Sequence, residues 1–281
     1  TERVSFSFNT ETGYYSQPNV LVPGTNISQQ GDYFASATTL GMLVQWLPRF
    51  STVTSYTFSP IFYVEESLND NLGRIQQTVS QSFNFLVKPT TTAVVEYRIS
   101  PTTYFKADLN SLDQYALVGF NHIFNPRMTW NARVGAQFNI LQNPVDGQTY
   151  YFGPYGETAF AYNYGEVSKL SFTLRYGTEA SGLQNVTQRQ SLRTGLGITH
   201  GITKKLVASG GVFYGVNYYD QGDVIDSYFE NILELTAGLE FELNRFLSFN
   251  TGYRFTGVLS PENPDGQYTR DIVFVGLTSK F

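Results

Sequence analysis

The stretch Arg270-Asp-Ile-Val-Phe-Val-Gly-Leu-Thr-Ser-Lys-Phe281 decides how the rest of the chain is interpreted. Counting back in twos from Phe281 gives Ser279, Leu277, Val275 and Val273, and the other register gives Lys280, Thr278, Gly276 and Phe274. Because side chains alternate between the two faces of a strand, this pattern predicts a β-strand with one apolar and one mostly polar or small face. On this stretch alone, a strand of a soluble β-sandwich is a fair alternative.

Composition narrows the class of protein. The chain has 281 residues, of which 41% are hydrophobic and 16% aromatic, with 23 Phe and 20 Tyr. Its apolar runs are far shorter than the roughly 18 residues of a membrane-spanning helix, which excludes a helical membrane protein but not a barrel, where only alternate residues face lipid. The absence of cysteine is compatible with an oxidising compartment, and the net charge of −5 gives no electrostatic argument for nucleic acid. No signal peptide is visible, so an exported protein would be present in its processed form.

The alternating pattern recurs along the whole chain. We predict fourteen strands, at about residues 3–15, 33–46, 50–65, 75–87, 92–105, 114–124, 128–140, 149–164, 169–176, 188–200, 205–218, 228–243, 246–259 and 270–281. Seven longer loops (17–31, 67–74, 106–113, 142–148, 177–187, 219–227 and 260–267) alternate with six short turns (47–49, 88–90, 125–127, 165–168, 201–204 and 244–245). Most of these strands are longer than the roughly 5–6 residues of soluble sheets, as tilted membrane crossing requires.

These observations predict an all-β fold without helices, in which residues 1–281 form one 14-stranded antiparallel up-and-down transmembrane β-barrel. In such barrels the short turns are periplasmic and the long loops extracellular, so we expect both termini on the periplasmic side. Pro60, Pro101 and Pro154 fall inside predicted strands, near their long-loop ends. Proline cannot donate a ladder hydrogen bond, so we expect incomplete strand pairing there. Trp46, Phe50 and Trp130 beside short turns, and Tyr14, Tyr15, Tyr150, Tyr151, Tyr218, Tyr219 and Tyr228 beside long loops, fit interfacial aromatic girdles.

Two segments carry a family resemblance. Tyr268-Thr-Arg270 with Val273-Phe-Val-Gly-Leu277 and the final Phe281 resembles the closing strand, and its sorting signal, in the putative β-barrel porin family of bacterial outer-membrane proteins. The strand–turn stretch Leu192-Arg-Thr-Gly-Leu-Gly-Ile-Thr-His-Gly-Ile-Thr-Lys204 is similar to others in that family. The resemblance covers roughly the last third of the chain. Because members are often associated with exopolysaccharide gene clusters, it implies an outer-membrane barrel with that genomic context.

The polar strand faces supply the candidate site. If the apolar faces meet lipid, ten charged residues face the lumen: Glu96, Arg98, Arg133, Glu157, Arg175, Arg193, Glu234, Glu240, Glu242 and Arg254. A basic residue on the lipid face at mid-depth would cost roughly 2–4 kcal/mol, which supports the inward assignment. Many other inward positions are small: Gly135, Gly195, Gly197, Ser209, Gly211, Gly215, Gly238 and Gly252. Because fourteen strands also exceed the roughly eight at which side chains alone fill a barrel, we expect an open lumen into which only residues 17–31 are long enough to fold.

Two arrangements of these charges are open. Arg133, Arg175 and Arg193 lie on different strands from Glu234, Glu240 and Glu242, so rows of opposite charge could set up a field across the lumen and sort ions by sign. The alternative is local pairing, for example of Glu96 with a basic group on a neighbouring strand, which leaves no net field.

Other chemistry finds little support. His122 and His200 both lie near short turns, and no nucleophile with an acid–base pair converges on them, so we expect no enzymatic activity. Asp220, Asp223 and Asp226 could hold calcium through oxygen ligands, although a solvated acidic loop explains them more simply.

The sequence therefore predicts an outer-membrane channel, porin-like, for passive diffusion of small hydrophilic solutes or saccharides, without cofactor or metal. The alternative is a structural or accessory outer-membrane barrel, part of exopolysaccharide export or of a surface assembly. A surface hydrolase is a weaker third class. Expected partners are outer-membrane lipid, lipopolysaccharide and small solutes, with no nucleic acid. A homo-oligomer or an export-machine partner is a further option.

Overall fold

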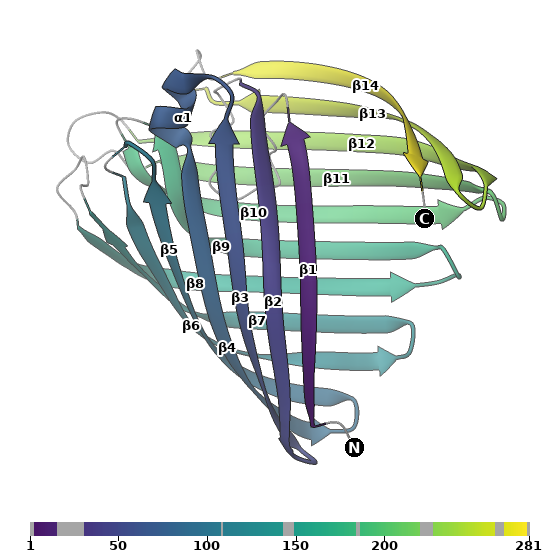
Figure 1. Ribbon diagram of the computed structural model, residues 1–281, viewed down its shortest axis with the longest axis horizontal. Coiled ribbons are helices and arrows are strands. Elements are labelled where there is room, and N and C mark those ends of the chain that lie inside the picture. The colour runs from purple at the N-terminus through teal and green to yellow at the C-terminus, as the bar shows by residue number, and fades with distance from the viewer. Residues whose placement is uncertain are drawn as a thin grey trace.

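The chain folds into one antiparallel sheet of fourteen strands, seen in a computed structural model that describes residues 3–15, 31–107, 109–142, 149–183, 186–219, 227–261 and 267–279 (Figure 1). The strands lie in the sheet in chain order. They are β1 (Val4–Tyr15), β2 (Tyr33–Leu47), β3 (Phe50–Tyr63), β4 (Arg74–Lys88), β5 (Thr91–Tyr104), β6 (Ser111–Asn125), β7 (Met128–Leu141), β8 (Tyr150–Asn163), β9 (Lys169–Leu183), β10 (Val186–Gly201), β11 (Leu206–Tyr219), β12 (Tyr228–Asn244), β13 (Leu247–Leu259) and β14 (Tyr268–Ser279). The predicted up-and-down antiparallel topology is confirmed.

Each strand has two chemically distinct faces because its polar and apolar residues alternate. On β12, Leu233, Leu235 and Leu239 are exposed, whereas Glu234 between them is only 4% exposed. On β7, Val134 is 58% exposed, and Gln137 on the opposite face is 1% exposed. The exposed apolar residues therefore form an outer face suited to lipid, and polar residues occupy the inner face of the curved sheet.

The connections agree with the predicted alternation except at two places. A short helix, α1 (Glu66–Leu72), occupies most of the predicted loop 67–74, where we expected no helix. Its Leu72 is 3% exposed and packs against Tyr33, Ile61 and Tyr63, so tertiary contacts stabilise a helix whose sequence carries no helical periodicity. Within the described residues, no helix is long and apolar enough to span a membrane.

The second difference is larger. Residues 177–187 were predicted to form a loop, but β9 and β10 continue through most of this segment and leave only residues 184–185 between them. The β9–β10 ladder extends to the pair Val186–Leu183, with a register shift between Val186 and Gln188. The Gly, Ser, Asn and Gln residues of the segment suggested a loop, yet pairing between the strands overrides that local preference.

The predicted effect of the three strand prolines is confirmed. The β2–β3 ladder skips from the pair Thr38–Phe58 to Ala35–Ile61 around Pro60, and the β4–β5 ladder skips around Pro101. The β8–β9 ladder ends at Gly156–Tyr176, two residues from Pro154. In each case, a strand that cannot donate from its proline loses pairing on one side.

The aromatic residues divide between the two faces. Trp46, Tyr14 and Tyr150 are 57%, 62% and 63% exposed and point outward, as an interfacial girdle requires. Tyr219 and Tyr228, which we assigned to the same girdle, are instead 3% and 7% exposed and stack on each other with ring centroids 4.6 Å apart. Their place in the alternation puts them on the inner face. Tyr15, which stacks on the buried Tyr33, and Tyr151, which alternates with the exposed Tyr150 and Phe152, lie on that face as well, so these four assignments were wrong.

The strands β1 and β14 form the two edges of the sheet. The sheet curls round as a barrel wall does, and no ladder joins β1 to β14 among the described residues (Figure 1). Phe281 and residues 17–30 of the first long loop, which carried predictions about the barrel seam and a plug, lie outside the described residues.

Candidate pore lining

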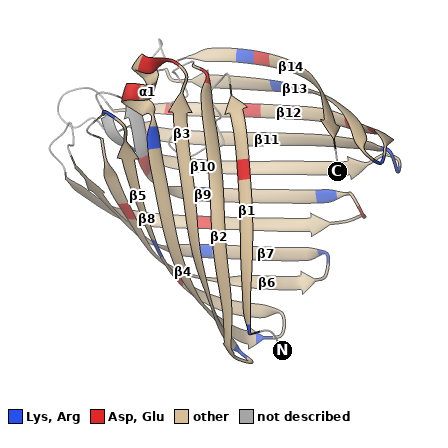
Figure 2. Ribbon diagram, in the orientation of Figure 1, with Lys and Arg blue, Asp and Glu red and all other residues tan. Residues whose placement is uncertain are grey.

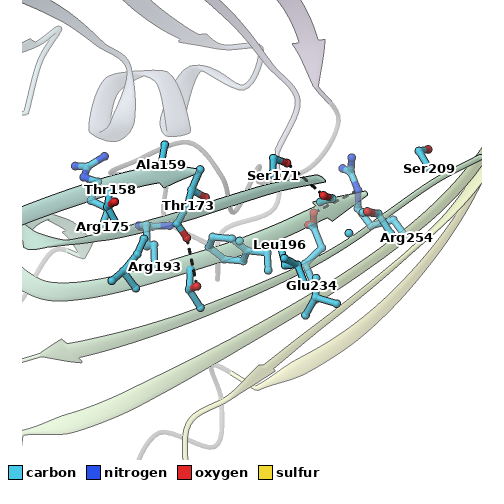
Figure 3. Close-up of a pocket in the computed structure, with 18 of the residues that line it drawn as sticks. Thr158, Ala159, Ser171, Thr173, Arg175, Arg193, Leu196, Ser209, Glu234 and Arg254 are labelled. Carbon is cyan, nitrogen blue, oxygen red and sulfur yellow. Dashed lines mark hydrogen bonds and ion pairs between the residues drawn. The ribbon is translucent and has the colours of Figure 1, made fainter. Parts of the chain in front are cut away.

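Two cavities open on the inner face of the sheet. The larger, of about 730 Å³, is bounded mainly by strands β8–β13 (Figure 3). Small and hydroxylated residues cover much of its wall: Thr158, Ser171, Thr173, Gly195, Gly197, Ser209, Gly211, Thr236 and Gly238. The predicted small inward positions on β10, β11 and β12 therefore do leave space inside the sheet, and the walls offer hydrogen-bonding groups to a hydrated solute.

The smaller cavity, of about 460 Å³, is lined from β3, β4, β5 and β6 and by residues of β8 and β9. Glu157 and Arg175 line both cavities. They face each other as a register pair of β8 and β9, so the two cavities meet at this pair of charges.

The structure places most of the ten predicted lumen residues at these cavities. Seven line one or both cavities: Glu96, Arg98, Glu157, Arg175, Arg193, Glu234 and Arg254. Arg133 reaches the same region, with its Nε 3.6 Å from Glu96 Oε2. Glu240 and Glu242 are half-buried and share the Glu234 face of β12 by alternation, nearer the short-turn end. A role of these residues in conduction stays a prediction.

A first charge cluster joins β5, β7 and β8. Arg98 Nη2 lies 2.8 Å from Glu96 Oε1 and 3.1 Å from Glu157 Oε1, so one guanidinium bridges two carboxylates. Arg133 reaches Glu96 across β6, where its register partner is Gly119. A Cβ at Gly119 would lie 2.9 Å from Arg133 Cδ, so the missing side chain gives the arginine its path. Arg98 also lies over the Tyr115 ring, 5.6 Å from its centroid.

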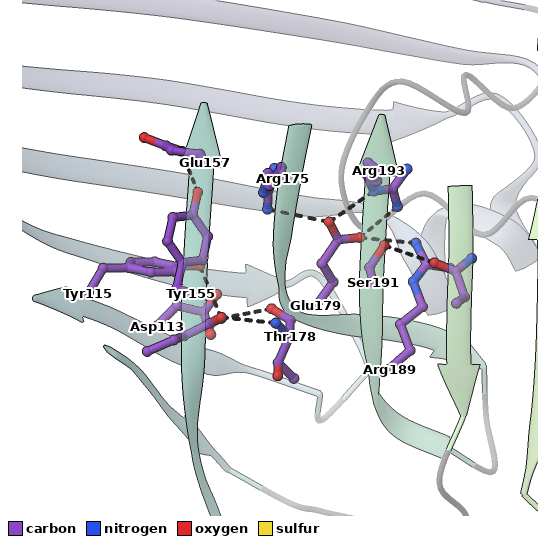
Figure 4. A network of polar contacts seen from close by, with 12 residues as sticks. Asp113, Tyr115, Tyr155, Glu157, Arg175, Thr178, Glu179, Arg189, Ser191 and Arg193 are labelled. Atoms are coloured by element: carbon purple, nitrogen blue, oxygen red, sulfur yellow. Dashed lines mark hydrogen bonds and ion pairs between the residues drawn. The ribbon is translucent and has the colours of Figure 1, made fainter. Parts of the chain in front are cut away.

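A second cluster centres on Glu179 of β9 (Figure 4). Its carboxylate lies 2.7 Å from Arg193 Nη2, and 3.3 Å from both Arg175 Nη2 and Arg189 Nη2. Arg189 is 1% exposed and also donates to Tyr219 Oη at 3.0 Å. Three guanidinium groups thus surround one buried carboxylate on the inner face.

Sequence reasoning missed Glu179 and Arg189 as site residues. Glu179 lies in the segment 177–187 that we took for a loop, so it was not assigned to a face, and Arg189 lies near the start of the predicted strand 188–200 but was not included among the lumen residues. A signal was available, because Glu179 follows Arg175 by four residues and Arg189 precedes Arg193 by four. In continuous strands those spacings place all four side chains on the inner face.

The charges are paired locally and do not form separate rows. Arg98, Arg133, Arg175, Arg193 and Arg254 each have a carboxylate within 4.0 Å, the last being Glu234 at 3.7 Å. Figure 2 shows acidic and basic residues interspersed over the strands. The hypothesis of basic and acidic rows facing each other was therefore wrong, and the local pairing that we held as its alternative is what the structure contains. Coulomb attraction between neighbours outweighs any gain from separation when long side chains on adjacent strands can reach each other.

Within the described ranges, no group of three or more His, Cys, Asp or Glu side chains is placed to hold a metal ion. Asp220, Asp223 and Asp226, the candidate calcium ligands, lie outside those ranges. Each of the two histidines has a hydroxyl group as its hydrogen-bond partner: His122 Nδ1 lies 2.8 Å from Thr91 Oγ1, and His200 Nδ1 lies 3.2 Å from Tyr164 Oη.

Long antiparallel strands with an apolar outer face and a polar, cavity-bearing inner face define a β-barrel of the bacterial outer membrane, of the channel or transporter class. The family model described as putative beta-barrel porin 2 matches residues 69–281. The chain belongs to that family.

Solved structures agree with the fold. Two variants of the FrpB iron transporter from Neisseria meningitidis match 92% of this chain, F5-1 with a TM-score of 0.52 and 11% identity and F3-3 with 0.50 and 9%. This chain spans about half the length of either, 50%. A Pseudomonas aeruginosa FadL homologue matches 98% of this chain and 85% of its own, with 12% identity and a TM-score of 0.42. A search of curated proteins found no match. At these identities, the FrpB structures support the fold alone.

Proposed function

We propose that this barrel is a channel for the passive diffusion of small hydrophilic solutes, saccharides included, across the outer membrane. One observation carries the proposal: the inner face holds a cavity of about 730 Å³ whose wall includes six residues with a hydroxyl group and four glycines, beside charged and apolar residues. Such a wall hydrogen-bonds a passing solute without holding it through one strong contact, which suits diffusion better than retention. The proposed role needs neither catalysis nor a cofactor.

The paired charges support a weakly selective pore. Paired arginines and carboxylates present alternating partial charges to water and little net field. The structural relatives include an iron transporter, which fits movement of solutes through a barrel but supplies no substrate for this chain. We further propose that the long loops face the cell exterior and that lipid and lipopolysaccharide surround the outer face.

The second candidate is a structural or accessory barrel, part of an export machine or surface assembly. Close packing of inward side chains near the long-loop ends of β9–β12 favours this candidate. Four polar residues there are at most 6% exposed and hydrogen-bond one another or their neighbours: Arg189, Ser191, Asn217 and Glu230. A lumen filled at that level would conduct little.

Reconstituting the purified full-length chain into planar bilayers and liposomes separates the two candidates. A diffusion channel gives stepwise single-channel conductance and lets liposomes swell in isotonic arabinose or glucose. A barrel that inserts, as shown by its heat-modifiable migration on gels, yet gives neither signal contradicts the channel proposal.

A further inference from the structure

The barrel wall is split between β8 and β9 on its long-loop side. The β8–β9 ladder runs from Asn163–Lys169 to Gly156–Tyr176 and stops there. Both strands continue: β8 pairs with β7 up to Tyr150, and β9 pairs with β10 up to Leu183. The far part of the β9–β10 hairpin, residues 177–183 and 186–191, is therefore attached to β11 but not to β8. We call this part the distal hairpin.

The sequence explains where the split begins. Continuing the register of the β8–β9 ladder by two residues would place Pro154 opposite Thr178. Proline has no N–H to give to the carbonyl of Thr178, so the ladder cannot continue. The Gln137 side chain supplies the bond instead: its Nε2 donates to Thr178 O at 2.7 Å, and Thr178 N donates to its Oε1 at 2.9 Å. One amide side chain of β7 thus stands in for the missing strand partner.

These contacts put the start of the distal hairpin on the lumen side of β8. Gln137 points inward and is only 1% exposed, and its register partner on β8 is Gly153, which has no side chain to block its path to β9. The Tyr155 ring also points inward and lies against Gly177, where a Cβ would be 2.7 Å from Tyr155 Cδ2. The successive residues Thr178 and Glu179 point to opposite faces of β9 and are both buried, at 5% and 7% exposure. At this point β9 is therefore covered on both faces.

The distal hairpin begins beside the point where the two cavities meet. Glu157 and Arg175, where the two cavities meet, are one residue below the end of the ladder. Glu179 pairs with Arg175 on its own strand and with Arg189 and Arg193 on β10, as Figure 4 shows, so the cluster ties the two strands of the hairpin to each other. The contact that ties the hairpin to the rest of the wall is the Gln137 amide.

We propose that the distal hairpin is the constriction that sets the size limit of the channel, held on the lumen side of β8 by the Gln137 amide. The inference rests on the proposed channel function. It adds that two strands of the barrel wall, and not a separate plug, limit the size of solute that can pass. Because Pro154 interrupts the β8–β9 ladder there, restoring the ladder should widen the pore.

Two variants test this in the full-length protein. Gln137→Ala/Pro154→Thr removes the stand-in amide and gives β8 the missing N–H, so β9 can pair with β8 along its whole length. Pro154→Cys/Thr178→Cys joins the same positions by a disulfide, which hydrogen-bonded cross-strand pairs about 5.5 Å apart accommodate. The natural chain has no cysteine, so this would be the sole bridge. Gln76→Ala, which removes an inward amide from β4, is the control.

We expect both variants to raise unit conductance by about twofold and to admit larger sugars, such as sucrose and raffinose, in liposome swelling, because lumen width governs both. Dithiothreitol should return the disulfide variant to the wild-type value, and Gln76→Ala should match the wild type.

If the wild type conducts and both inserted variants have the same unit conductance as the wild type, the distal hairpin is not the constriction. If the wild type is silent but a variant conducts, the hairpin is the block and passive diffusion through the wild type is wrong. If all are silent, the channel function fails and the inference with it.

Discussion

At the scale of single residues, Glu179 is the side chain on which most interactions of the inner face converge. Its carboxylate pairs with Arg175, Arg189 and Arg193 and is 7% exposed as a residue. Replacing it by glutamine keeps the shape but leaves three buried guanidinium groups without that charge. We expect Glu179→Gln to lower the free energy of unfolding by about 3–5 kcal/mol, measured by urea titration of the barrel in lipid vesicles.

The matched control for this change is Glu242→Gln on β12, whose side chain is half-buried on the same inner face. Its effect should stay within about 0.5 kcal/mol, as for substitutions outside tight networks. Equal effects at both positions would mean that the Glu179 cluster contributes no special stability.

The assignment of faces makes a second prediction at this scale. Val134 lies at the middle of β7 and is 58% exposed, whereas Ser209 on β11 lines the larger cavity. Val134→Arg would place a charge in lipid and should cost about 2–4 kcal/mol of unfolding free energy, while Ser209→Arg should cost far less. The same urea titration measures both, and a reversed order would show that the inner and outer faces have been exchanged.

The sequence alone predicted which residues lie on the inner and outer faces, because the alternation of side chains along a strand does not depend on which strands are its neighbours. It found eight of the ten predicted lumen residues at or beside the cavities, for the same reason. It could not find which charges pair, because pairing depends on register and on gaps such as Gly119, through which Arg133 reaches Glu96 two strands away. Those are properties of neighbouring strands and not of any one stretch.

At the scale of elements, the strands were predictable and their ends were not. Period-two patterns gave all fourteen strands, since each must bury one face and expose the other to lipid. The helix α1 was missed because it is held by burial of Leu72 and by the bond from Lys106 Nζ to Asp70 Oδ2 at 2.8 Å, both tertiary effects. That hydrogen bond also raises the pKa of the Lys106 ammonium above its usual range. The distal hairpin was missed because its composition resembles a loop.

The arrangement of short and long connections predicts the direction of insertion. A tag placed within residues 263–266 or at 222–223 should be accessible to antibody on intact cells, because long loops of such barrels face outward. A tag at Asn244–Arg245, between β12 and β13, should be labelled only after the outer membrane is permeabilised. The opposite labelling pattern would overturn the orientation, while the fold would stand.

At the scale of the whole molecule, the net charge of the protein differs from the charge that a solute in the larger cavity meets. The chain carries a net charge of −5, yet the larger cavity is lined by Arg175, Arg193 and Arg254 against Glu157 and Glu234. Local pairing cancels most of that field, because the buried Glu179 also pairs with Arg175 and Arg193. The charge most open to a permeating ion is that of Arg254, whose side chain is 40% exposed, against 5% for its partner Glu234. The pore should therefore prefer anions weakly, in spite of the sign of the whole chain.

Arg254 is the residue through which this preference can be tested. It is the most exposed arginine of the paired set, at 40% of its side chain, and its Nε is 3.7 Å from Glu234 Oε1, the longest ion pair among them. Its charge is thus the least compensated one facing the cavity. In bilayers under a KCl gradient, we expect Arg254→Ala to shift the permeability ratio toward potassium by roughly twofold at 0.1 M salt. The difference should vanish near 1 M, where the Debye length falls from about 10 Å to about 3 Å.

Arg127→Ala, in the short turn between β6 and β7, is the control, because its exposed charge lies outside the cavity. A shift of equal size in the control would place the selecting charge at the pore mouth, and no shift in either would mean that paired charges leave the lumen neutral to ions.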